Sequence, residues 1–135
     1  MGKLKPYLIS TDARTQGEFY TVALEGEIVS VLTHEEAMGA QHEFKDKVMH
    51  MCISVAGNNN IFLADAFEPV VQGTCISLSI EYEREAEAAA VFAKLADGGQ
   101  IKHPFELQPF GIYYGELLDR FGVSWMITAP APAKP

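Results

Sequence analysis

Two stretches of the chain place apolar side chains at the spacing of an amphipathic helix. These positions are Phe19, Tyr20, Ala23 and Leu24 within residues 13–24, and Ala88, Val91, Phe92, Leu95 and Ala96 within residues 84–97. Residues three or four positions apart share one face of a helix, so each stretch predicts a helix with one buried face. Asp12 is the expected N-cap of the first helix, and Gly26 and Gly98 are expected just beyond the two helix ends. A short helical turn is also predicted where Thr33 and Glu36 match a capping box.

The other apolar runs have the composition and alternation of β-strands. Each predicted helix is preceded by one such run and followed by three, which gives the order βαβββ twice. The predicted strands are residues 5–11, 26–33, 47–55, 58–65, 74–82, 99–105, 110–118 and 123–128. We therefore expect an α+β protein, one domain over residues 1–129 made of two βαβββ modules at about 1–68 and 72–129. Residues 130–135 have the Pro- and Ala-rich composition of a flexible tail.

Alternation along the strands separates a helix-covered face from a second face. The helix-covered face is expected to carry Met49, Met51, Ile53 and Val55, then Ile76, Leu78 and Ile80, and finally Val123, Trp125 and Ile127. The second face is expected to carry Val48, His50, Cys52 and Ser54, then Cys75, Ser77, Ser79 and Glu81, and finally Ser124, Met126 and Thr128. Because sheets twist, two such sheets are expected to enclose a cleft between their second faces.

Composition and charge exclude several classes of function. The chain has 135 residues, 48% of them hydrophobic, which fits one soluble domain. With 18 Asp plus Glu against 10 Lys plus Arg, the net charge of −8 opposes binding to nucleic acid. No apolar run is long enough to span a membrane, and the N-terminus lacks the apolar core of a signal peptide, so a cytoplasmic location is expected. Cys52 and Cys75 are too few for a disulfide framework and lack the spacing of a zinc site.

Four segments carry a resemblance to a known family. They are Pro6-Tyr7-Leu8, Glu18-Phe19-Tyr20 leading to Gly26-Glu27-Ile28-Val29, Lys47-Val48-Met49-His50, and Asp119-Arg120-Phe121-Gly122-Val123-Ser124-Trp125-Met126-Ile127. By these motifs the chain resembles the glyoxalase/bleomycin-resistance (vicinal oxygen chelate) superfamily and, within it, the PhnB-like branch. The most specific motif is the Asp-x-x-Gly turn before the last strand, and the resemblance spans nearly the whole chain. It implies a paired βαβββ fold, a homodimer and a small-molecule site in cupped sheets.

The resemblance also implies where a metal would be held. Metal-dependent members of the superfamily carry His, Gln or Glu on the first strand of each half and Glu on the last strand of each half. In the first half of this chain, the first-strand position corresponds to Lys5 or Tyr7 and the last-strand position to Phe62 or Ala64. In the second half, they correspond to Cys75 and Met126. This set lacks the imidazole and carboxylate groups that zinc, nickel or iron prefer, so we expect no metal site and no cofactor.

The candidate functional residues lie on the second face. His50 is the candidate catalytic residue, an acid or base near neutral pH, and a structural histidine satisfied by neighbouring strands is the alternative. Asp65 and Glu116 are interpreted either as paired carboxylates or, for one of them, as a strand-end residue. The two cysteines are expected to be buried, unreactive thiols. The expected lining of the ligand-binding cleft is Tyr7, His50, Phe62, Cys75, Ser77, Tyr113 and Met126. Tyr114 and Phe110 are further aromatic candidates for this lining, and some of these aromatic residues are expected to be core.

Three functions are compatible with these residues. The first, favoured by elimination, is binding of a small organic ligand in a metal-free cleft, as in sequestration by bleomycin-resistance relatives. The second is a lyase or isomerase with His50 as acid or base. The third is a metal-dependent lyase or dioxygenase with a non-standard ligand set that includes His50 and His103. The residues leave open whether the protein is an enzyme, and the ligand is not identified because the conformations of loops 34–46 and 66–73 do not follow from the pattern.

Overall fold

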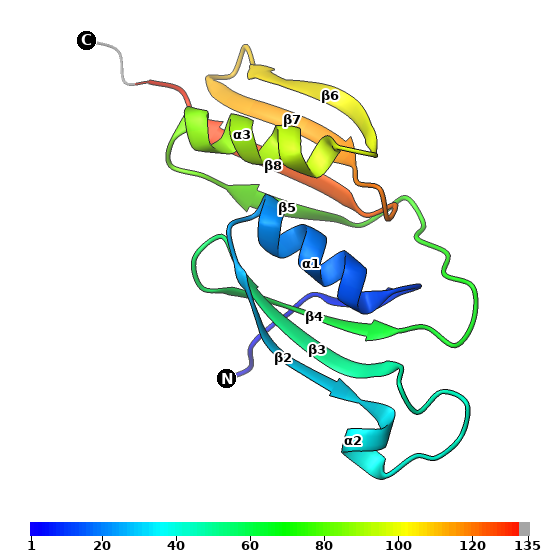
Figure 1. The fold of residues 1–135 in the computed structure, drawn as a ribbon. Helices are drawn as coiled ribbons and strands as arrows, with labels where there is room; N and C mark the ends of the chain where they lie inside the picture. The colour runs from blue at the N-terminus through cyan, green and yellow to red at the C-terminus, as the bar shows by residue number, and fades with distance from the viewer. Residues whose placement is uncertain (133–135) are drawn as a thin grey trace. The chain divides into compact units, whose positions relative to one another are not determined.

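Each half of the chain folds into one long helix packed against a four-stranded sheet (Figure 1). The computed structural model describes residues 1–132, and it divides into two compact units, unit 1 (Met1–Val71) and unit 2, which begins at Gln72. Each unit has the order βαβββ, with one additional short helix in unit 1. The predicted α+β fold and its internal duplication are therefore confirmed. Of the predicted tail, Pro130 ends the last strand, and residues 133–135 lie outside the described residues.

Unit 1 has the strand order β1-β4-β3-β2. β1 runs parallel to β4, whereas β4 with β3 and β3 with β2 are antiparallel. Its elements are β1 (Tyr7–Ser10), α1 (Ala13–Ala23), β2 (Glu27–Thr33), α2 (His34–Met38), β3 (Val48–Val55) and β4 (Asn59–Asp65). α1 packs mainly against β3, and the opposite face of the sheet has no helix over it among the described residues of this unit.

Unit 2 repeats this topology with the strand order β5-β8-β7-β6. β5 is parallel to β8, and the other two pairs are antiparallel. Its elements are β5 (Ser77–Glu81), α3 (Glu85–Ala96), β6 (Gln100–Leu107), β7 (Ile112–Leu118) and β8 (Ser124–Pro130). α3 packs against β8, β7 and β6 through the predicted apolar residues Ala88, Val91, Phe92 and Leu95.

The helix α1 begins as predicted and ends one residue earlier than its glycine suggested. The Asp12 carboxylate accepts a hydrogen bond of 3.1 Å from the backbone N–H of Thr15, which confirms the N-cap. Leu24 is the C-cap, and Glu25 takes the left-handed conformation (φ 51°) that Gly26 was expected to adopt. Gly26 has a different role. A Cβ at Gly26 would overlap the carbonyl oxygen of Ser54, so only glycine allows the chain to pass β3 so closely.

The predicted capping box is present at the start of α2. The Thr33 hydroxyl accepts from the Glu36 N–H, and the Glu36 carboxylate accepts from the Thr33 N–H, both at 3.1 Å. These hydrogen bonds lower the pKa of Glu36, with the Thr33 side chain the largest cause and its backbone next. They explain how a helix of only five residues is held at the end of β2.

The strand boundaries differ from prediction at the start of unit 2. β5 begins at Ser77, so Cys75 and Ile76 precede the strand. Ile76 was expected under the helix and is 79% exposed, which makes that prediction wrong. The interior positions follow the prediction, since the parallel register pairs Ser77 with Ser124 and Ser79 with Met126.

The Asp-x-x-Gly motif is a structural turn between β7 and β8. One oxygen of the Asp119 carboxylate accepts from the backbone N–H of Phe121 (2.8 Å) and of Val123 (3.0 Å). The other oxygen accepts from the indole N–H of Trp125 at 2.9 Å. Asp119 is 3% exposed and Trp125 is 1% exposed, so this carboxylate organises both the turn and the core of unit 2.

Candidate functional site

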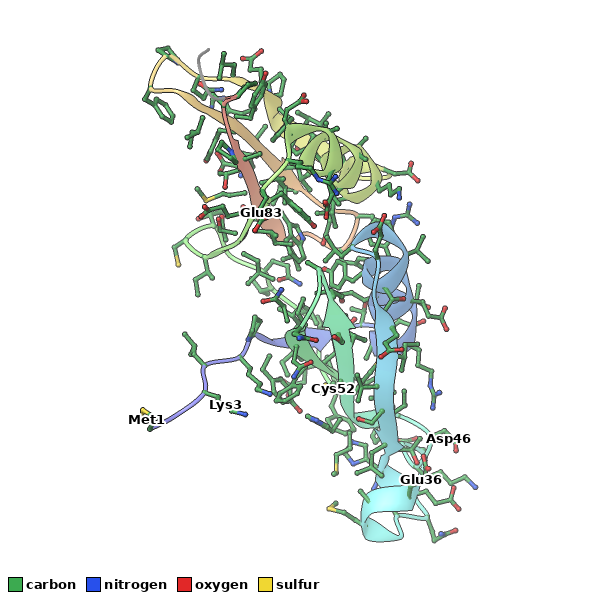
Figure 2. All side chains as sticks on the ribbon, turned by 90° about the vertical axis from the view of Figure 1, so that its left-hand side faces the viewer. Met1, Lys3, Glu36, Asp46, Cys52 and Glu83 are labelled. Atoms are coloured by element: carbon green, nitrogen blue, oxygen red, sulfur yellow. The ribbon has the colours of Figure 1, made fainter. Side chains whose placement is uncertain are left out.

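The open face of the unit 1 sheet, opposite α1, brings together three of the predicted site residues. The strand register places Tyr7 of β1 beside Phe62 of β4, and Phe62 beside Cys52 of β3. His50 lies two residues before Cys52 on the same strand and is paired with Leu32 of β2. Side chains at paired and alternate positions of a sheet share one face. Cys52, labelled on β3 in Figure 2, therefore marks the middle of this face.

Tyr7, His50 and Phe62 form a cluster of three rings on this open face. The ring centroids of His50 and Phe62 are 4.7 Å apart, those of Tyr7 and His50 are 5.8 Å apart, and those of Tyr7 and Phe62 are 6.0 Å apart. The Tyr7 hydroxyl lies 3.4 Å from both His50 Nδ1 and the carbonyl oxygen of Met49. Tyr7 is 48% exposed and His50 is half-buried. The cluster is thus an aromatic surface with polar atoms at its edge, accessible from solvent.

A lysine adds positive charge to the cluster. Lys5 Nζ lies 4.9 Å from the centroid of the Phe62 ring, within the range of a cation–π contact. Lys5 is half-buried, whereas Lys3 is exposed and extends from the sheet together with Met1, as Figure 2 shows. The contact with Phe62 therefore places one ammonium group beside the three rings.

A groove of about 690 Å³ adjoins this cluster within unit 1. Tyr7, Ile9 and Ala64 line it from the sheet, and the segment of residues 66–71 that follows β4 lines the other side. Most of the lining is apolar, and Ile9 is 50% exposed. Its volume is in the range of pockets that hold small organic molecules, about 300–1,000 Å³.

The groove is shaped by aromatic contacts at its end near α2. Phe67, in the segment that follows β4, has its ring centroid 5.2 Å from that of His34 and 5.2 Å from that of Phe44. Lys47 Nζ donates to the carbonyl oxygen of Ala66 at 3.3 Å. These contacts tie the segment after β4 to the loop between α2 and β3, neither of which has a regular hydrophobic period.

Asp65 supports the groove rather than offering a free carboxylate. One oxygen accepts from the N–H of Ala13, the first residue of α1, and the other accepts from the N–H of Val48, both at 2.7 Å. Both oxygens are therefore occupied by backbone donors. Of the two interpretations of Asp65, this geometry supports the strand-end residue.

The open face of the unit 2 sheet is polar. Ser77 and Ser124 share a hydrogen bond of 2.6 Å between their hydroxyls, and Met126 lies between Ser79 and Glu116 in register. The Tyr114 hydroxyl donates to the Glu116 carboxylate at 3.2 Å. Burial, then the charge of Glu116 and this hydrogen bond, raises the pKa of Tyr114 above its ordinary value.

Two predicted site residues of unit 2 lie away from that open face. Tyr113 shares the helix-covered face with Gly115 and stacks on Phe105 at 5.8 Å, and Phe105 in turn contacts Phe92 of α3. The open face carries Tyr114 instead. Cys75 is exposed because it precedes β5, so the prediction that it is buried is wrong. Ile9 and the segment of residues 66–71 are site components that the predicted lining did not include.

The residues at the positions of the superfamily's metal ligands do not fit a metal ion. Tyr7 and Phe62 are engaged in ring contacts, Met126 offers a thioether, and Cys75 lies outside the strand. Among residues 1–132, no group of three or more His, Cys, Asp or Glu side chains could hold a metal. Zinc and iron prefer imidazole and carboxylate, so we assign no chemical step to a metal at these positions.

The described part of the chain contains no helix long and apolar enough to cross a membrane.

Comparison with known proteins gives one family and several similar structures. The family model described as 3-demethylubiquinone-9 3-methyltransferase matches residues 3–128. The structure of protein PA1353 from Pseudomonas aeruginosa has 26% identity and a TM-score of 0.84, covering 98% of this chain and 100% of that one. The PhnB protein from Bacillus cereus, titled with the same methyltransferase description, has 28% identity and a TM-score of 0.76, covering 95% and 99%.

A third similar structure shows the shared fold. It is a glyoxylase/bleomycin resistance protein/dioxygenase domain from Frankia sp. EAN1pec, with 14% identity and a TM-score of 0.69, covering 96% of this chain and 98% of that one. The comparison with curated protein sequences gives no match.

Proposed function

Because the chain belongs to the PhnB-like family, whose model is described as 3-demethylubiquinone-9 3-methyltransferase, within the glyoxalase/bleomycin-resistance superfamily, we propose that it binds a small organic molecule on the open face of unit 1. The observation that carries this proposal is the groove of about 690 Å³ next to the rings of Tyr7, His50 and Phe62. The proposal concerns binding and does not include the methyl transfer that the family description names.

The chemistry of the face suits a planar, largely apolar ligand. Burying an aromatic ring against Tyr7, Phe62 and Ile9 removes apolar surface from water on both partners, at about 25 cal/mol per Å². The polar atoms at the edge, His50 Nδ1 and the Tyr7 hydroxyl, can orient one polar group of the ligand. On unit 2, Ser77, Met126 and Tyr114 belong to a more polar open face, which we propose as a separate contact surface of that unit.

We also propose a cytoplasmic homodimer. β1 and β2 are the outer strands of the unit 1 sheet, and β5 and β6 are the outer strands of the unit 2 sheet. Val29 on β2 and Ile101 on β6 are large apolar side chains with more than half of their surface exposed. Unpaired edges with apolar side chains favour association with another chain. Sedimentation at micromolar concentration is expected to give a dimer, and a monomer alone would overturn this proposal.

A thermal-shift screen of metabolites and antibiotics tests the binding function. A ligand at about 100 times its Kd is expected to stabilise the protein by about 2.7 kcal/mol. Phe62→Ala and His50→Ala are expected to abolish most of this shift, because they remove ring area and the polar edge. Val22→Ala is the control, since Val22 is 73% exposed on α1 and does not belong to either open face. An equal ligand shift in all three variants would place binding elsewhere.

A second candidate function is a lyase or isomerase that uses His50 as acid or base. The observation that favours it is the Tyr7 hydroxyl beside Nδ1, which orients the imidazole and leaves Nε2 for a substrate proton. Turnover that is lost in His50→Ala and unaffected by a chelator would support catalysis. Binding without turnover for every ligand found in the screen would leave the binding function alone.

A further inference from the structure

The open face of unit 1 differs in charge from the chain as a whole. The chain has a net charge of −8, yet the ammonium group of Lys5 lies over the Phe62 ring and the imidazole of His50 is part of the ring cluster. By register, the carboxylate on this face is Glu27, opposite Ser54 at the hairpin end of β3. Ser54 is one alternate position beyond Cys52 and two beyond His50, so the negative charge of Glu27 lies at the far end of the sheet from the ring cluster.

The acidic residues that line the groove are either occupied or exposed. Both oxygens of Asp65 accept backbone hydrogen bonds. Glu68 is exposed, so water and salt screen its charge. Lys47 Nζ donates to the carbonyl oxygen of Ala66, which lines the groove, and adds a second positive charge there. Two ammonium groups therefore lie near the groove, Lys5 over the Phe62 ring and Lys47 on the Ala66 carbonyl, beside the carboxylates of Asp65 and Glu68.

We propose that the ligand of this site is an aromatic anion, a planar carboxylate or enolate whose ring packs on Tyr7 and Phe62 and whose negative charge lies beside Lys5. This inference rests on the proposed function and adds the class of ligand to it. The rings supply the apolar surface, and the His50 imidazole, whose Nδ1 lies beside the Tyr7 hydroxyl, can donate a hydrogen bond from Nε2 to an oxyanion. Lys5 lies over Phe62, so an anion that packs against Phe62 meets the ammonium group at the ring edge.

Calorimetric titration with three ligands of one shape separates the charge from the ring. 2-Naphthoate, 2-naphthamide and 2-naphthylmethylamine carry the same ring with a negative, neutral and positive substituent. We expect the naphthoate to bind about fivefold more tightly than the amide, because an exposed ion pair contributes modestly. The amine is expected to bind most weakly. Added sodium chloride is expected to reduce the difference between naphthoate and amide.

Lys5→Gln tests the role assigned to this ammonium group, and Lys3→Gln is the matched control. Both variants remove one positive charge from the same N-terminal segment, but Lys3 is exposed and extends away from the sheet (Figure 2). Lys5→Gln is expected to bring the ratio of the two dissociation constants close to one, and Lys3→Gln to leave it unchanged. Circular dichroism of each variant confirms that the fold is retained.

The outcomes separate this inference from the proposed function. Equal binding of naphthoate and amide, tighter binding of the amine, or an unchanged ratio in Lys5→Gln overturns the assignment of an anionic ligand. If one of these results is found and Phe62→Ala nevertheless abolishes binding of the naphthalene ligands, the proposed function is still supported. Binding of none of the three ligands overturns both.

Discussion

Replacement of Asp119 tests whether the family's most specific motif is structural. Its carboxylate accepts three hydrogen bonds, from the N–H groups of Phe121 and Val123 and from the indole of Trp125. In Asp119→Ala these donors lose their acceptor, and two of them belong to buried residues. Leaving a buried donor unsatisfied costs about 1–3 kcal/mol, so for two donors the loss of unfolding free energy is expected to be about 2–6 kcal/mol.

Asp119→Asn makes the same test at nearly constant volume. Its amide oxygen can still accept from the N–H groups of Phe121 and Val123, but its NH₂ group then faces the indole N–H of Trp125. One buried donor is left unsatisfied, so we expect a smaller loss of about 1–3 kcal/mol. In a double-mutant cycle, Trp125→Phe removes that donor. The loss of unfolding free energy caused by Asp119→Asn is expected to be about 1 kcal/mol smaller in the Trp125→Phe background.

Urea unfolding provides the measurement. Trp125 is the single tryptophan and is buried, so its fluorescence reports on unit 2, and circular dichroism serves for the variants that lack it. If Asp119→Ala changed the unfolding free energy by less than about 0.5 kcal/mol, the turn would not depend on this carboxylate, since such values are typical of surface substitutions. Additive effects in the cycle would likewise refute the indole contact as a stabilising interaction.

Three further predictions concern backbone packing and titration. Gly26→Ala is expected to lower the unfolding free energy by about 1–3 kcal/mol, because a Cβ there overlaps a backbone carbonyl of β3, and urea unfolding measures it. Thr33→Ala is expected to raise the pKa of Glu36 toward its ordinary value, which NMR titration measures. The lowered pKa stabilises the folded protein above the unfolded-state pKa of Glu36, and this stability is lost as pH falls through the folded-state pKa. Thr33→Ala is expected to remove this pH-dependent contribution. Because the pKa of Tyr114 is raised in the folded protein, the unfolding free energy is expected to fall as pH rises from the ordinary tyrosine pKa through the folded-state pKa of Tyr114. Glu116→Gln is expected to lower the pKa of Tyr114, which tyrosinate absorbance titrations measure.

The Gly26 and Tyr114 predictions each have a control in the chain. Gly2→Ala serves for Gly26→Ala, because a Cβ at Gly2 meets nothing within 4 Å. Tyr114→Phe identifies which absorbance change belongs to Tyr114. If the pKa of Tyr114 in Glu116→Gln equalled that of the unmodified protein, burial alone would raise it. If Gly26→Ala and Gly2→Ala had equal unfolding free energies, the close approach of Gly26 to β3 would not constrain this position.

The local signals in the sequence were sufficient for the helices and for the duplication. Asp12, Thr33 and Glu36 make capping interactions that depend on residues within three positions, so the chain order alone specifies them. The same holds for the turn at Asp119, whose carboxylate reaches backbone groups two and four residues later. Short-range geometry of this kind is readable from a single sequence.

The face of a strand was harder to predict where two aromatic residues are adjacent. Tyr113 and Tyr114 both suit a cleft, and alternation shows that they point to opposite sides without showing which side the helix covers. Gly115 settles the assignment, because a Cβ there would meet the Phe92 ring of α3. The glycine therefore lies under the helix, and Tyr113, two positions before it, lies on the same face. A small residue between bulky ones was the signal that could have identified Tyr114.

The groove could not be predicted because no periodic pattern specifies its outer wall. The segment of residues 66–71 has no repeating apolar spacing. Its position depends on contacts of Phe67 with His34 of α2 and with Phe44 of the loop that follows α2. Such contacts between non-periodic segments follow from the folded structure. The sheet side of the groove, by contrast, follows from the alternation of Tyr7 and Ile9 along β1.

The two copies of the module separate the requirements of folding from those of binding. In both, the face under the helix is apolar, with Met51 and Ile53 in unit 1 and Trp125 and Ile127 in unit 2 all nearly inaccessible to solvent. The open faces share a topology but differ in chemistry: unit 1 carries aromatic rings beside Lys5, whereas unit 2 carries hydroxyl and carboxylate groups. Burial constrains the first face of any such module, while the open face is free to vary with the ligand. The difference between the open faces is therefore where ligand specificity should be sought, and the charge at Lys5 is its most direct test.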